Sequence, residues 1–145
     1  MKHFFLMVTK PRLWLALFVL WMTLLWVLSS SSKVSPEEGP QIPHFDKIAH
    51  FGYFFGGGII LSTWILLKHS TRSSLLTRYL SPIVFFAIFG LIDEYHQTFT
   101  PGRSGNDVYD WLADFFGSFV GILLANHFHP YLIKFSSSSG IEPEN

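Results

Sequence analysis

Four apolar stretches, each close to the length that crosses a lipid bilayer, dominate this 145-residue chain. A transmembrane helix needs roughly 20 mostly apolar residues, with a tolerance of about 17 to 25. On this criterion we predict helices at 13–28, 48–67, 75–92 and 108–125. The fold class that follows is an all-α integral membrane bundle of four transmembrane helices. It forms a single domain, 1–135, and the serine-rich tail, 136–145, is expected to be disordered.

The composition supports a membrane domain and argues against a nucleic-acid partner. Charged residues make up 14% of the chain, whereas about 25% is usual in a soluble domain. The ten basic and ten acidic side chains give a net charge of zero, and no basic block interleaved with aromatic residues indicates nucleic-acid binding. The chain has no cysteine, which excludes disulfides, thiolate metal sites and cysteine nucleophiles.

The first apolar stretch also fits a cleaved signal peptide, because Lys10 and Arg12 precede it and serines follow it. Its tryptophans and the lack of an Ala-x-Ala cleavage site favour a retained helix. We therefore count this stretch as the first membrane crossing.

The distribution of Lys and Arg orients the predicted bundle, because basic residues near helix ends tend to stay in the cytoplasm. With the N-terminus inside, only Lys33, Lys47 and Arg103 among the basic residues fall outside, whereas most acidic residues do. Both termini are then expected to be cytoplasmic. The proline-containing loop 29–45 is expected to lie over the outer face as a flexible cover.

Polar side chains that are costly in hydrocarbon gather at the external ends of the last three predicted helices. We interpret them as one candidate site and divide them by expected role. The candidate acid–base residues are His50, Asp93, His96, Asp110 and Asp114, and the candidate binding residues are Asp46, Lys47, Glu94, Gln97 and Arg103.

Helical spacing predicts how some of these side chains meet. Asp46 and His50 are four residues apart, so the carboxylate can orient the imidazole, while Lys47 points to a different side. An acidic residue in a first helical turn is also favoured by the helix dipole, so a charged cap is the plainer interpretation of Asp46.

The third predicted helix ends in a dense polar group. If it continues past residue 92, Asp93, His96 and Gln97 share a face, and Glu94 turns away from them. So many titratable or amide groups close to hydrocarbon are expensive unless they are paired with one another or hydrated. The group is therefore expected to be functional.

Asp107, Asp110 and Asp114 recur at spacings of three and four on the fourth predicted helix. Ser104 and Asp107 fit a capping box in its general form. Capping does not account for Asp114, which lies well inside the apolar run and must face a partner or water. Among all the candidates, Asp114 indicates a function most strongly.

Two G-x-x-x-G pairs predict close approach of the second and fourth helices. They are Gly52 with Gly56 and Gly117 with Gly121. Such an approach would bring His50 beside Asp110 and Asp114. In the loop that follows the third helix, the forked donors of Arg103 suit a carboxylate or a phosphate, so this residue either ties neighbouring carboxylates together or binds a ligand.

These residues together resemble the motifs of the VanZ-like family of small bacterial membrane proteins, over about residues 43–121. The motifs are Asp46-Lys47-x-x-His50-Phe51, Asp93-Glu94-x-x-Gln97, Pro101-Gly102-Arg103 and Asp110-x-x-x-Asp114-x-x-Gly117. The resemblance implies an all-helical fold in the bacterial inner membrane and, from the family's namesake, an association with resistance to glycopeptide antibiotics such as teicoplanin. It implies no mechanism. The family pattern often has asparagine where this chain has Asp114, so the added negative charge is expected to be a feature of this chain.

Three functions fit the pattern. The first is an enzyme that acts at the outer leaflet on a lipid-linked or cell-envelope substrate, with the acid–base residues above and with Arg103 and Lys47 holding an anionic headgroup. The second is a non-catalytic protein that binds a lipid headgroup or an envelope component. The third is a proton or ion carrier. The position of all candidate groups at one side of the membrane argues against it. We rank catalysis slightly ahead of binding and transport third. A purely structural role in helix packing is the remaining alternative.

The histidine and carboxylate groups also suit a divalent metal such as Mg²⁺, Mn²⁺ or Zn²⁺, although the chain has no His-Glu-x-x-His motif. The partners expected from the sequence are membrane lipids and a lipid-linked envelope substrate.

Overall fold

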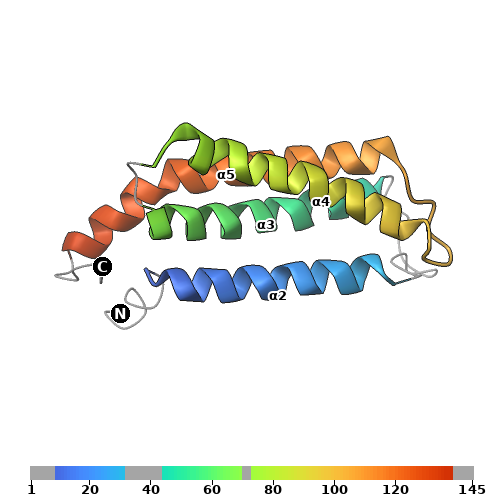
Figure 1. The fold of residues 1–145 in the computed structure, drawn as a ribbon, viewed down its shortest axis with the longest axis horizontal. Coiled ribbons are helices and arrows are strands. Elements are labelled where there is room, and N and C mark those ends of the chain that lie inside the picture. The colour runs from blue at the N-terminus through green and yellow to red at the C-terminus, as the bar shows by residue number, and fades with distance from the viewer. Residues whose placement is uncertain (1–8, 32–43, 70–72, 139–145) are drawn as a thin grey trace.

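The computed structural model describes residues 9–31, 44–69 and 73–138, and side chains within this part as far as residue 131. The described chain is helical. Its elements in order are α2 (Pro11–Ser29), α3 (Phe45–His69), the short π-helical turn η1 (Leu76–Leu80), α4 (Ser81–Gln97) and α5 (Val108–Ser138). Figure 1 shows the helices lying side by side along one long axis, with the start of α2 and the end of α5 at the same end.

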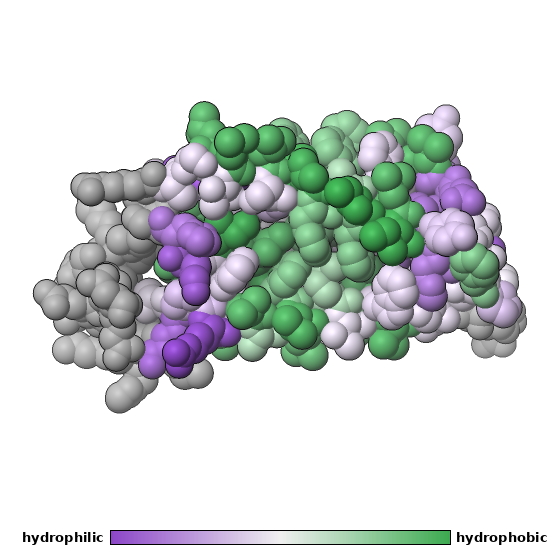
Figure 2. All heavy atoms as spheres, in the orientation of Figure 1, coloured by the Kyte–Doolittle hydropathy of each residue, from purple (hydrophilic) through white to green (hydrophobic). Residues whose placement is uncertain are grey.

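The prediction of four membrane-spanning helices is confirmed. The segments that are long and apolar enough to cross a membrane are Pro11–Ser29, Phe45–His69, Leu76–Gln97 and Val108–Tyr131. Figure 2 shows, on one face of the bundle, an apolar band across the middle and hydrophilic residues toward both ends. Because lipid offers no hydrogen bonds to an open backbone, helices of this length with apolar outer faces are the expected solution.

The helix ends differ from the predicted ones where polar residues are packed inside the bundle. α4 does not stop at residue 92 but continues to Gln97, and α5 continues beyond residue 125 to Ser138. The apolar run marks where hydrocarbon ends, whereas the backbone hydrogen bonds of a helix continue past that point. Residues 136–138, at the start of the tail that was expected to be disordered, are helical, while residues 139–145 and most of the loop 29–45 lie outside the described residues.

A proline explains the irregular start of the third crossing. Pro82 follows η1 and has no N–H to donate, so the carbonyl of Arg78 loses its usual helical partner. The turn before it widens to the π form. The side chain of Asn126 on α5 lies against this turn, with its Nδ2 3.5 Å from the Arg78 carbonyl oxygen and its Oδ1 accepting from Arg78 Nε at 3.1 Å.

α3 and α5 are the most closely packed pair of helices, and glycines permit the approach. The backbone of α5 at Gly117 lies against the carbonyl of Phe51, and Gly121 lies against that of Phe55. On α3, Gly58 lies against the backbone of Ser118. A β-carbon at any of these three glycines would collide with backbone atoms of the other helix, so small residues set the distance between the helices.

The predicted G-x-x-x-G pair on α5 is therefore at this contact, but the predicted pair on α3 is wrong. A β-carbon at Gly52 would meet nothing within 4 Å, and Gly56 lies against Trp21 of α2. The face of α3 that meets α5 carries residues 51, 55 and 58, which follow one another at spacings of four and three. Residues 52 and 56 lie on neighbouring faces of the same helix.

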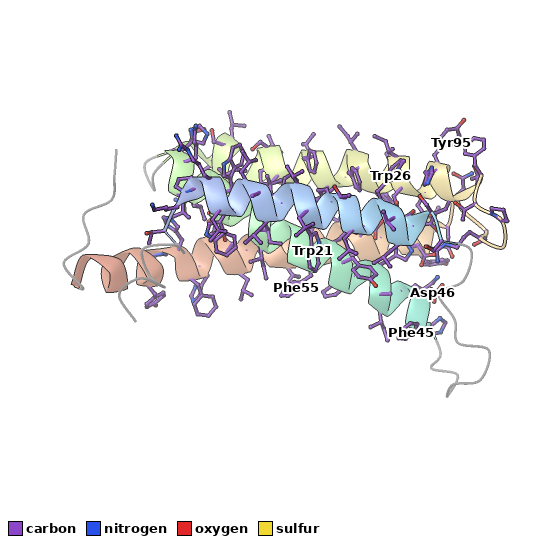
Figure 3. The ribbon with its side chains drawn as sticks, turned by 90° about the horizontal axis from the view of Figure 1, so that it is seen from below. Trp21, Trp26, Phe45, Asp46, Phe55 and Tyr95 are labelled. Atoms are coloured by element: carbon purple, nitrogen blue, oxygen red, sulfur yellow. The ribbon has the colours of Figure 1, made fainter. Side chains whose placement is uncertain are left out.

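α2 packs against α3 and α4 through aromatic residues. The Trp21 indole nitrogen donates to the carbonyl of Tyr53 at 2.9 Å, and Phe18 meets Phe85 and Phe86 edge to face. Figure 3 shows Trp21 and Trp26 along α2, with Asp46 and Tyr95 at one end of the bundle. We call this end, where α3 begins and α4 finishes, the site end.

Candidate functional site

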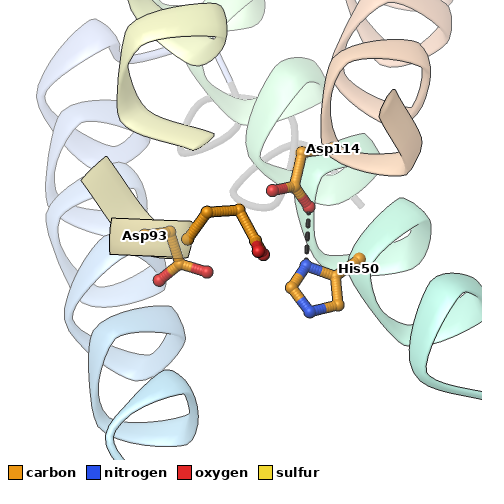
Figure 4. Close-up of side chains that lie close together, drawn as sticks. His50, Asp93 and Asp114 are labelled. Atoms are coloured by element: carbon orange, nitrogen blue, oxygen red, sulfur yellow. Dashed lines mark hydrogen bonds and ion pairs between the residues drawn. The ribbon is translucent and has the colours of Figure 1, made fainter. Parts of the chain in front are cut away.

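Three helices bring ionisable side chains together near the site end. His50 lies in the second turn of α3, Asp93 and Glu94 lie near the end of α4, and Asp114 lies in the second turn of α5. All four side chains are buried, and Asp114 is 0% exposed. We call these four residues the carboxylate–histidine cluster. Figure 4 shows His50, Asp93 and Asp114 pointing toward a common centre from their three helices.

His50 contacts Asp114, the residue for which the sequence indicates a function most strongly. His50 Nδ1 lies 2.9 Å from Asp114 Oδ1. With Asp114 ionised, Nδ1 would carry the proton, because an ionised carboxylate only accepts hydrogen bonds, and Nε2 would keep its lone pair when the ring is neutral. The expected orientation of His50 by Asp46 is wrong. The Asp46 side chain is 52% exposed and binds Lys47, because α3 turns His50 toward α5.

Each carboxylate of the cluster has one oxygen with a partner and one without. Asp93 Oδ2 accepts from Gln97 Nε2 at 2.9 Å, and Glu94 Oε2 accepts from the backbone N–H of Asp107 at 2.8 Å. The opposite oxygens, Asp93 Oδ1, Glu94 Oε1 and Asp114 Oδ2, are buried without a hydrogen-bond partner among the described residues. A buried carboxylate oxygen without a partner is costly, so a proton or a cation at these three atoms would stabilise the cluster.

The four side chains of the cluster are close enough to share one ligand. One ligand atom from each of His50, Asp93, Glu94 and Asp114 can be chosen so that all lie within 4.8 Å of one another. The position of Glu94 corrects the expectation that it turns away from Asp93. Consecutive helical residues differ in direction by about 100°, and the cluster lies between the two directions, so both side chains reach it.

A second charged group lies beside the cluster and is balanced by a lysine. Lys47 Nζ is 3.0 Å from Asp46, 3.1 Å from Asp107 and 2.9 Å from Asp110. These contacts tie the start of α3 to the start of α5. Since Lys47 already has three carboxylate partners, it serves as their counter-charge. Among the described residues, no ion pair joins a lysine or arginine to the carboxylate–histidine cluster itself.

The loop between α4 and α5 is anchored to the cluster. Besides the bond to its side chain, Glu94 accepts from the backbone N–H of Asn106 through its carbonyl at 3.2 Å. Gly105 has a φ of +56°, and a β-carbon there would collide with the backbone of Thr98, so the tight turn requires glycine. The loop thus places Arg103 near the same end of the bundle.

The capping interaction at the start of α5 differs from the predicted one. Asp107 itself caps the helix, because its Oδ1 accepts from the backbone N–H of Tyr109 at 2.8 Å. Ser104 takes no part in this cap. The bond from Tyr109, together with Lys47, holds the pKa of the Asp107 carboxyl below its ordinary value.

Two further predicted residues do not join the cluster. His96 faces α2, where its ring stacks on Trp26 with centroids 4.2 Å apart and its Nε2 lies 2.9 Å from Ser30 Oγ. Arg103 makes no ion pair with any residue that the structure describes, and its Nε is buried without a partner there. Neighbouring carboxylates within the described chain therefore do not account for its charge.

Buried polar residues outside the cluster, His129 and Asn126 among them, were not predicted from the sequence. His129 on α5 is 1% exposed, and neither ring nitrogen has a hydrogen-bond partner among the described residues. It lies near the opposite end of the bundle, one turn after Asn126. The spacing of three between these polar residues within an apolar helix could have indicated a shared buried face. The statement that all candidate groups lie at one side was therefore incomplete.

The fold and the cluster define a multi-pass helical membrane protein with a buried site at one end. The family model described as VanZ/LLP1 matches residues 9–129, and the chain belongs to this family. The match also covers the first crossing, which the resemblance seen in the sequence did not. No curated protein and no solved structure matches the chain.

Proposed function

We propose that the protein is a membrane enzyme that acts on an anionic, lipid-linked substrate of the cell envelope. The observation that carries the proposal is the convergence of four buried ionisable side chains from three helices, with three carboxylate oxygens lacking partners. Burying such groups in a membrane is expensive, and they persist where they serve a site. At this end of the described bundle, they are the groups suited to activate a nucleophile, either as general bases or through a bound cation.

Arg103 supplies the proposed contact to the substrate. Its guanidinium has no described carboxylate partner, and the loop that carries it is bonded to Glu94, a member of the cluster. A planar guanidinium binds phosphate or carboxylate groups with paired hydrogen bonds. We infer that Arg103 holds the anionic group of the substrate while the cluster acts on a neighbouring bond. Lys47 is less suited to this role because it already forms ion pairs with three carboxylates.

The charge distribution supports the outer leaflet as the location of this chemistry. If most Lys and Arg residues remain inside, the site end faces outward. Membership of a family with a bacterial namesake supports the inner membrane of a bacterium as the location. Sensitivity to teicoplanin-type antibiotics would then change if the substrate were a precursor or lipid on which those antibiotics act.

Turnover by purified protein tests this function. Wild-type protein in vesicles of bacterial envelope lipids is expected to convert many lipid molecules per protein, detected by mass spectrometry of the extracted lipids. Asp93→Asn and Asp114→Asn are expected to lower the rate about 100-fold or more, as removal of acid–base groups does. His127→Gln is the matched control, because His127 is an exposed histidine toward the other end of α5.

Lipid analysis of the purified protein, together with a test of cell survival in teicoplanin, separates catalysis from binding. A binder would retain a lipid during purification without changing it, and both aspartate variants would protect cells against teicoplanin as well as the wild type does. That combination would contradict the proposed enzyme and favour the non-catalytic alternative. Acidification of vesicles by the protein, without any change in lipid, would favour a proton carrier instead.

A further inference from the structure

We propose that the carboxylate–histidine cluster binds one divalent cation, of the class that accepts both carboxylate and imidazole ligands, with Mn²⁺ as the representative. Each of His50, Asp93, Glu94 and Asp114 would offer one ligand atom, a ring nitrogen or a carboxylate oxygen. The inference concerns the site of the proposed function and rests on that function only for what the cation would do there.

Charge is the first argument. The cluster contains three carboxylates and no lysine or arginine among its described ion-pair partners, and Lys47 neutralises a different group. Like charges this close in a medium of low polarity repel strongly. Either protons or a cation must offset them. A divalent ion offsets two charges at once and also satisfies three buried oxygen atoms that otherwise have no partner.

Geometry is the second argument. Opposite ligands of an octahedral ion lie about 4.2 Å apart when each bond is about 2.1 Å long. The ligand atoms of the cluster all lie within 4.8 Å of one another. Closing around an ion therefore needs shifts of only a few tenths of an ångström, and the ligands come from three helices that already pack together. Water or a substrate oxygen would complete the coordination.

The third argument is that the side chains of the cluster are held in place. Gln97 donates to one oxygen of Asp93, and the backbone N–H of Asp107 donates to one oxygen of Glu94. Metal-binding carboxylates characteristically have such outer partners, which orient the other oxygen toward the ion. His50 and Asp114 orient each other, because Nδ1 lies 2.9 Å from Oδ1.

The donor set selects the class of ion. Carboxylate oxygens alone suit Mg²⁺ or Ca²⁺, whereas imidazole suits transition metals, and a mixed set of three oxygens and one nitrogen suits Mn²⁺, Fe²⁺ or Zn²⁺. Within the proposed enzyme, such an ion would make a bound water more acidic and would place positive charge beside the anionic substrate. This would explain why an acidic site accepts an anionic ligand.

Binding of Mn²⁺ alone tests the inference without any substrate. Purified full-length protein in detergent is treated with EDTA, dialysed and titrated with Mn²⁺, and free Mn²⁺ is measured by its electron paramagnetic resonance signal. One Mn²⁺ per chain is expected to bind, with competition from Zn²⁺. Asp93→Asn and Asp114→Asn are expected to weaken binding about 100-fold, while His127→Gln binds as the wild type does.

Thermal unfolding shows whether the variants are folded. Without metal, Asp93→Asn and Asp114→Asn are expected to unfold no lower than the wild type, because each removes one of three repelling charges. Mn²⁺ is expected to raise the unfolding temperature of the wild type and of His127→Gln only. Should either aspartate variant not fold, Glu94→Gln takes its place. Failure of the wild type to bind Mn²⁺ or Zn²⁺, or equal binding by the folded variants, would overturn the inference.

This result is separable from the proposed function. Protein that binds Mn²⁺ but changes no envelope lipid leaves the cation site standing and contradicts the enzyme. Lipid turnover that persists in EDTA, in protein that binds no Mn²⁺, contradicts the cation site and leaves the enzyme in place.

Discussion

Replacing both Gly117 and Gly121 with alanine is expected to destabilise the bundle severely and to disrupt the site. Each new β-carbon would collide with a backbone carbonyl of α3, that of Phe51 or that of Phe55. Backbone does not rotate away as a side chain can, so the two helices must separate. Overpacking of this kind costs about 1–3 kcal/mol at each position. The free energy of unfolding, measured by titration with SDS in mixed micelles, is expected to fall by about the sum.

Gly52→Ala is the matched control for the glycine variant. Its β-carbon meets nothing within 4 Å, and alanine favours a helix over glycine by about 1 kcal/mol. This variant is therefore expected to be neutral or slightly stabilising.

In the double variant of Gly117 and Gly121, the separation of α3 and α5 should also lengthen the contact between His50 and Asp114. The double variant should therefore lose Mn²⁺ binding. Equal stability of the double variant and Gly52→Ala would show that α3 and α5 do not pack as described.

Lys47→Met is expected to lower the free energy of unfolding by about 2 kcal/mol. Lys47 contacts Asp46, Asp107 and Asp110, and the Asp110 side chain is only 9% exposed. Removing one partner of a fully buried pair costs about 3–5 kcal/mol, and a surface pair contributes about 1 kcal/mol or less. The Lys47 side chain is 26% exposed, so an intermediate loss is expected. The same unfolding titration in mixed micelles measures it.

Lys68→Met is the control for this variant, because Lys68 is an exposed lysine at the other end of α3. It is expected to change stability little. The double variant Lys47→Met with Asp110→Asn should recover part of the loss, since it removes the buried charge that Lys47 neutralised. If Lys47→Met is as stable as Lys68→Met, the three carboxylate contacts do not hold the start of α3 to α5.

The membrane crossings could be predicted because their signal is local. The length of an apolar run and the polar residues that end it are properties of a single segment, and all four crossings were found in this way. The approach of His50 to Asp114 was also predicted, from close contact between two G-x-x-x-G pairs, of which only the pair on α5 lies at the contact. Because Asp114 lies within an apolar run, close contact between α3 and α5 left it few polar partners other than His50.

The partners within the site could not be predicted because they depend on how each helix is rotated. Which face of α3 meets α5 is decided by Gly58 and not by the G-x-x-x-G pair that the sequence made prominent. With that rotation His50 contacts Asp114, and Asp46 is exposed. In the same way, His96 stacks on Trp26 of α2 and points away from the cluster. These choices are made by neighbouring helices and not by spacing along one helix.

Cross-linking of introduced cysteines tests most directly whether the polar groups of α3 and α5 meet. Because the natural chain has no cysteine, the double variant His50→Cys with Asp114→Cys gives an unambiguous signal in native membranes. A short thiol-specific cross-linker is expected to join these two positions within one chain, whereas His50→Cys with His127→Cys should give no product. Absence of the first product, or a product only between separate chains, would contradict the convergence of charged side chains on which the site depends.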